Sequence, residues 1–132
     1  MLRSYNADVN RFADAEIVTL LVGPNKVTFS VHKDILCQAS PYFKKAFNSG
    51  FKEAAKQSLT LAKDNPDNVD SIVKWVYFRI LEDSVPKDRE TAPVYARPLQ
   101  LYFLADKYDI PELRKELVQY FYGNRFHDEV PN

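Results

Sequence analysis

The chain has 132 residues and a formal net charge of zero, because 18 Lys and Arg balance 18 Asp and Glu. With 45% hydrophobic residues, it suits one globular domain whose core needs neither a metal nor a disulfide. The balanced charge gives no long-range attraction to nucleic acid or anionic lipid, so we expect neither as a direct partner.

The single cysteine, Cys37, has no other cysteine to pair with, which is typical of a reducing compartment. No apolar stretch approaches the ~20 residues of a membrane span. The sequence therefore predicts a cytoplasmic or nuclear protein that does not bind membranes. Residues 1–13 are polar without a period, and we expect them to form a flexible lead-in.

A β-hairpin is predicted next. Residues 17–22 are mostly β-branched and aliphatic, and residues 27–31 alternate between apolar and polar. Between them, Gly23, Pro24 and Asn25 supply the residue types that favour a turn.

Two short helices should follow the hairpin. The spacing becomes helical from Lys33 to Ala39, where Ser40 and Pro41 interrupt it. Serine is a good N-cap and proline is tolerated at the first helical position, so this pair should begin a second helix. Gly50 is placed to end that helix.

The second half reads as one strand and three helices. Residues 58–61 form a strand candidate, and Asn65-Pro66 begins a helix whose apolar positions run from Val69 to Ile80. Residues 82–98 carry three prolines and no period, which predicts a long exposed loop. Residues 99–108 are apolar nearly all round, so that helix should be largely buried.

A last helix should begin at Asp109-Ile110-Pro111, with Leu113, Leu117, Val118, Tyr120 and Phe121 in the core, and end at Gly123. The order of strands and helices does not alternate strictly, which indicates an α+β fold. We predict a small three-stranded sheet flanked by about five α-helices.

Several segments resemble the BTB/POZ family, in register along the chain. Residues 29–43 (FSVHKDILCQASPYF) are similar to its signature of His, a basic residue, Leu and Ser-Pro-Tyr-Phe. Residues 104–108 (LADKY) and 75–77 (WVY) match two later segments. The matching positions of structural importance are Asp14, His32, Lys33, Leu36, Ser40, Pro41, Tyr42, Phe43, Ala105, Asp106 and Tyr108.

The resemblance implies a BTB/POZ domain over residues 14–125 with a tail at 126–132, and it looks closest to BTB proteins of filamentous fungi. BTB domains act as protein-interaction modules. Phe51-Lys52-Glu53 resembles the hydrophobic-x-Glu element through which BTB adaptors engage a cullin. By this resemblance the cullin contacts would be Phe51, Glu53, Lys44, Lys45 and Asn48.

Two functions stay open: a substrate adaptor of a cullin-RING ubiquitin ligase, and a self-associating scaffold that does not bind a cullin. Only residues 1–13 precede Asp14, where tightly dimerising members carry an extra strand and helix. No cofactor is expected, and we do not expect an enzyme. His32 and Cys37 lack a third orienting group, and Asp64, Asp67 and Asp70 are explained by a helix N-terminus rather than a metal.

Overall fold

The computed structural model describes residues 16–49, 52–81 and 96–129, except for the side chains of residues 52, 53 and 123–129. The described elements, in chain order, are β1 (Ile17–Val22), β2 (Val27–His32), α2 (Lys33–Ala39), α3 (Pro41–Asn48), α4 (Lys52–Lys56), β3 (Ser58–Leu61), α5 (Pro66–Phe78), α6 (Ala96–Lys107) and α7 (Pro111–Glu129). The α+β class is confirmed. The predicted lead-in and most of the predicted 82–98 loop lie outside the described residues.

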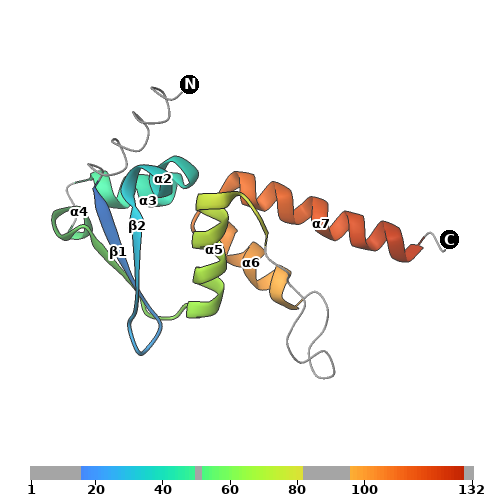
Figure 1. Ribbon diagram of the computed structural model, residues 1–132, viewed down its shortest axis with the longest axis horizontal. Helices are drawn as coiled ribbons and strands as arrows, with labels where there is room; N and C mark the ends of the chain where they lie inside the picture. The colour runs from blue at the N-terminus through green and yellow to red at the C-terminus, as the bar shows by residue number, and fades with distance from the viewer. Residues whose placement is uncertain (1–15, 50–51, 82–95, 130–132) are drawn as a thin grey trace, which may run out of the picture.

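A three-stranded sheet in the order β2-β1-β3 forms one side of the molecule (Figure 1). β1 and β2 pair antiparallel from Ile17 opposite His32 to Val22 opposite Val27, so the predicted hairpin is confirmed. β3 pairs parallel to β1, with Leu20 opposite Leu59. Gly23 begins the hairpin turn at a φ of 80°, a left-handed conformation that glycine adopts without a steric penalty.

The core lies between the sheet and the helices. Val18, Leu20 and Val22 point to one face of β1 and are at most 2% exposed, as the period of two in a strand requires. Phe47 of α3 and Trp75 of α5 are each 1% exposed in the same core cluster. Helices α2 and α3 lie near one end of the sheet, whereas α5, α6 and α7 follow one another away from it (Figure 1).

The start of α5 follows from its sequence, but its end is earlier than predicted. Asn65 caps the helix through a 2.7 Å bond from the Asp67 amide to its side-chain oxygen. The helix ends at Phe78, because Arg79 adopts a left-handed φ of 57° and its amide donates to the Trp75 carbonyl. Ile80 therefore lies beyond the helix and is 62% exposed.

The structure corrects three further expectations about helix bounds. α4 was not predicted, since the five residues KEAAK favour a helix but are too few to show a period. α6 begins at Ala96, inside the predicted loop, because Pro98 falls in the first turn where amides lack an intrahelical acceptor. α7 continues through Gly123 to Glu129, since one glycine weakens a helix by only ~1 kcal/mol. Six helices are thus described instead of about five.

α6 is also less buried than its composition predicts. Pro98, Leu101, Leu104 and Ala105 face the core, but Leu99 is 43% and Phe103 61% exposed. Among the described elements, this helix packs mainly against α5 and α7, which leaves one side of it uncovered. Val118 of α7, predicted to be in the core, is likewise exposed.

Candidate functional site

The exposed face of α3 carries three of the predicted contact residues. Ser40 caps this helix by accepting a 3.1 Å bond from the Phe43 amide, and Pro41 occupies the first turn. Phe43 and Phe47, four positions apart, bury one face in the core. The opposite face presents Lys44, Lys45 and Asn48 to solvent, so the helix is strongly amphipathic.

Two shallow hollows adjoin this face of α3 and share Pro41, Lys44 and Asn48. The larger, about 520 Å³, lies toward α2 and is also lined by Asp34, Cys37 and Gln38. The smaller, about 360 Å³, is also lined by Lys45 and Ser49. Together these eight residues of α2 and α3 form what we call the α2–α3 surface, a wide and open area without a deep cavity.

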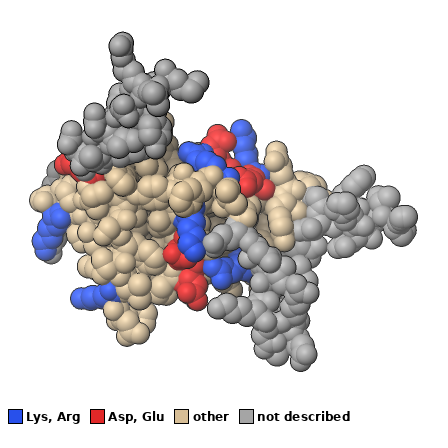
Figure 2. All heavy atoms as spheres, viewed as in Figure 1, with Lys and Arg blue, Asp and Glu red and all other residues tan. Residues whose placement is uncertain are grey.

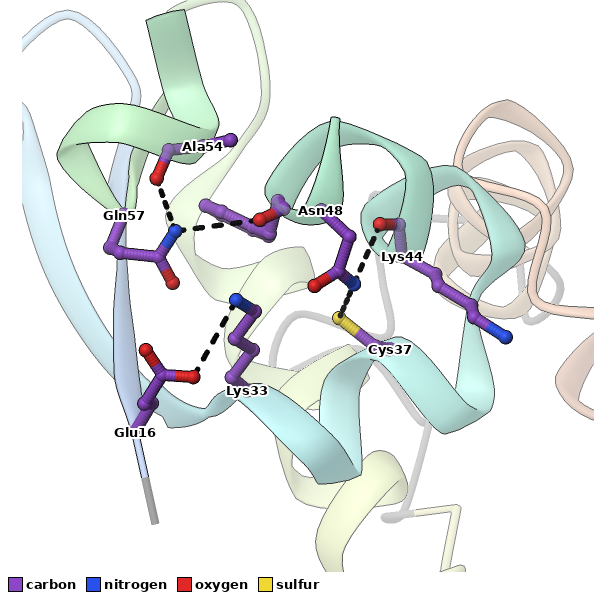
Figure 3. Close-up of polar contacts among 8 residues, drawn as sticks. Glu16, Lys33, Cys37, Lys44, Asn48, Ala54 and Gln57 are labelled. Atoms are coloured by element: carbon purple, nitrogen blue, oxygen red, sulfur yellow. Dashed lines mark hydrogen bonds and ion pairs between the residues drawn. The ribbon is translucent and has the colours of Figure 1, made fainter. Parts of the chain in front are cut away.

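Asn48 organises the middle of this surface. Its side-chain amide donates to the Lys44 carbonyl at 2.9 Å and lies 3.9 Å from the Cys37 sulfur (Figure 3). Burial raises the pKa of the Cys37 thiol, and the nearby charge of Lys33 offsets this only in part. The thiol is therefore protonated at neutral pH and a weak nucleophile.

The residues weighed for catalysis or metal binding have other contacts. Nδ1 of His32 lies 2.5 Å from the Tyr77 hydroxyl, which also accepts the His32 backbone amide at 2.8 Å. Within the described part of the chain, no three His, Cys, Asp or Glu side chains are placed to hold a metal ion. Asp64 instead binds Lys107 and Tyr108, and Asp70 pairs with Lys74 at 3.0 Å.

The remaining predicted contacts are only partly placed. Phe51 lies outside the described residues. Glu53 is the second residue of α4, whose backbone is described, but its side chain is not. The structure thus brings Lys44, Lys45 and Asn48 together on one exposed face, and it leaves the other two contacts as predictions.

The sequence profile of the BTB/POZ domain matches residues 10–125, most of the chain. The chain belongs to the BTB/POZ family. BTB domains are protein-interaction modules and are generally not enzymes. In the described residues no helix combines the length and the apolar character that crossing a bilayer requires.

Three curated relatives match this BTB domain over short stretches. Kelch-like ECH-associated protein 1A of Danio rerio is 39% identical over 51 residues, which are 39% of this chain and 8% of the relative. BTB and MATH domain-containing protein 15 of Caenorhabditis elegans is 36% identical over 77 residues, 58% of this chain and 26% of the relative. Kelch-like protein 38 of Homo sapiens is 37% identical over 46 residues, 35% of this chain and 8% of the relative.

This chain therefore spans about a quarter of the length of one of these relatives and less than a tenth of the other two. All three are animal proteins, so they give no support to the expected likeness to proteins of filamentous fungi.

Two solved structures share the fold. The BTB domain of human gigaxonin has a TM-score of 0.58 at 18% identity, over 90% of this chain and 86% of that one. The BTB domain of zebrafish PATZ1 has a TM-score of 0.63 at 15% identity, over 93% and 96%. At these identities the likeness shows the fold alone, and it confirms the predicted BTB architecture.

The BTB signature residues meet at the junction of α3 and α6. The Ser40 hydroxyl donates to the Tyr108 carbonyl at 2.5 Å. The ring of Tyr108 lies 5.1 Å from the rings of both Tyr42 and Phe43. Ala105, three residues before Tyr108 in the sequence, is fully buried, while Asp106 is exposed.

The other signature residues lie at the start of α2. Leu36 is buried, and Lys33 pairs with Glu16 at 3.6 Å. His32 occupies the N-cap position of α2, and its side chain makes no cap hydrogen bond there. Asp14 lies outside the described residues.

Sequence reasoning missed the contribution of α2 to the α2–α3 surface. Asp34, Cys37 and Gln38 were not predicted to line a surface with α3. Their spacing of three and four residues places them on one helical face, which is the pattern that would have found them. The role of Gln57 left no such pattern, because it depends on a contact with the Phe47 carbonyl of another helix, ten residues earlier in the chain.

Proposed function

We propose that this BTB domain binds the N-terminal region of a cullin and serves as a substrate adaptor of a cullin-RING ubiquitin ligase. The proposed contacts are Phe51, Glu53, Lys44, Lys45 and Asn48. The observation that carries the proposal is the position of the hydrophobic-x-Glu segment. In the sequence Phe51-Lys52-Glu53 begins three residues after the end of α3, whose exposed face presents the other three contacts.

The chemistry of these residues suits a protein surface. An aromatic side chain can serve as a buried anchor, and flanking charged residues can form a polar rim around it. The two lysines and Glu53 carry opposite charges, so a partner would need charges of both signs to match them. Figure 2 shows acidic and basic side chains lying side by side on the face drawn, without a large area of one sign. This mixture favours a protein partner of mixed charge.

The test is light scattering behind size exclusion, with the purified chain alone and mixed with a cullin N-terminal region. We expect a co-eluting complex. The double variant Phe51→Ala with Glu53→Lys should weaken binding by at least about tenfold, because it removes the anchor and reverses the charge beside it.

Glu112→Lys is the matched control, since it makes the same charge reversal at an exposed position at the start of α7. It should leave cullin binding unchanged. An unaltered affinity in the double variant would refute the proposed contacts. A chain that elutes as a dimer and does not co-elute with the cullin would favour the self-associating scaffold instead.

A further inference from the structure

Gln57 occupies the joint between α4 and β3. Its backbone has a left-handed φ of 52°, which ends α4 and turns the chain into β3. Its carbonyl accepts a 3.0 Å bond from the amide of Thr19 in β1, the central strand. The backbone of Gln57 is therefore anchored to the central strand of the sheet.

The side chain of Gln57 joins two helices through one amide group. Its Nε2 donates to the Phe47 carbonyl in the last turn of α3 at 3.4 Å, and also to the Ala54 carbonyl of α4 (Figure 3). Carbonyls in the last turn of a helix have no intrahelical donor. The two hydrogens of the Gln57 amide thus satisfy one such carbonyl from each helix.

The amide oxygen of Gln57 differs from the amide nitrogen in its hydrogen bonding. Gln57 Oε1 is buried and has no hydrogen-bond partner within the described part of the chain. A buried acceptor without a partner opposes folding. The side-chain hydrogen bonds of Gln57 are therefore made through its two donor hydrogens.

We propose that Gln57 is a positioning residue for the partner-binding surface; this inference rests on the proposed function. α3 carries Lys44, Lys45 and Asn48, and α4 carries Glu53. Gln57 holds the end of α3 against α4 and fixes both to β1. Gln57 thereby sets the distance between the contact residues on α3 and Glu53 on α4, without contacting the partner itself.

The substitution Gln57→Met tests this role. Methionine keeps the length of the side chain, but it lacks both donors and the unpartnered oxygen. We expect hydrogen exchange of the last α4 amides, residues 55 and 56, to become about tenfold faster, while exchange in β1 and α5 stays unchanged. Gln119→Met, on the exposed side of α7, makes the same chemical change and should alter neither region.

Binding to the cullin N-terminal region, measured by calorimetry, supplies the second readout. Gln57→Met should weaken binding by about tenfold. In a double-mutant cycle, Glu53→Ala should cost less affinity in the Gln57→Met background than in the wild type, because Glu53 is already misplaced there. If Gln57→Met only lowered the general stability, Glu53→Ala would cost the same affinity in the wild type and in the Gln57→Met background.

The outcomes separate the two proposals. Unchanged α4 exchange in Gln57→Met overturns the positioning role, whether or not the wild type binds a cullin. Faster exchange with strictly additive affinities also overturns it, because α4 would then move without affecting the contact. A wild type that binds no cullin refutes the proposed function. Faster α4 exchange in Gln57→Met would still show that the Gln57 side chain stabilises the position of α4.

Discussion

Replacing Ser40 by alanine should destabilise this BTB domain more than most Ser→Ala changes. Ser40 is fully buried, and its hydroxyl serves two elements: it accepts from the Phe43 amide at 3.1 Å and donates to the Tyr108 carbonyl at 2.5 Å. Loss of the helix cap costs ~1 kcal/mol. Loss of the donor to a buried carbonyl adds ~1–3 kcal/mol. We expect a total of about 2–4 kcal/mol, or a fall in Tm of roughly 10 °C.

Urea unfolding followed by tryptophan fluorescence measures this change directly, because the single tryptophan, Trp75, is 1% exposed in the folded state. The m-value should stay the same, so that the shift in midpoint reports stability alone. Ser30→Ala is the control, since Ser30 is exposed on β2 and its loss should cost less than ~0.5 kcal/mol. A cost for Ser40→Ala no larger than that of the control would refute the reasoning.

Two further predictions concern Tyr108 and Gly23. Burial, together with the hydrogen bond to the Asp64 carboxylate, raises the pKa of Tyr108 above its usual range. The folded state therefore holds this proton more tightly than the unfolded state, so the stabilisation is complete below pH ~10 and is lost above it, by at most about 1.4 kcal/mol per pH unit. Tyr108→Phe should show a flatter decline above pH 10 in urea titrations, and parallel curves would contradict this. Gly23→Ala should cost ~1–2 kcal/mol in a thermal melt, because the φ of 80° disfavours a Cβ, which would also lie 3.2 Å from Pro66 Cγ. An unchanged Tm would show that the turn adapts.

The sequence predicted those elements that are encoded by neighbouring residues. Asn65-Pro66 and Ser40-Pro41 mark helix starts because cap and first-turn preferences act over only a few positions. The hairpin follows from the turn residues between two β-branched runs. The exposed face of α3 is likewise encoded locally, since the apolar residues of this helix repeat with a helical period.

Helix ends were less predictable, since they depend on local conformations that several residue types can adopt. Arg79 ends α5 in a left-handed conformation without being a glycine, and its guanidinium lies 4.5 Å from the Trp75 ring. Gly123, in contrast, does not end α7, which continues to Glu129. The exposure of Phe103 likewise depends on how many helices pack around α6, which its own sequence does not specify.

The sequence by itself thus determined the family, the hairpin, the helix starts and the polar face of α3. Only the tertiary structure decided that Ser40 binds a carbonyl 68 residues away, and that Gln57 joins the ends of α3 and α4. It also decided that α2 and α3 share one surface. The physical reason is that propensities, caps and periods act within one element, whereas these contacts join different elements and form only when those elements pack together.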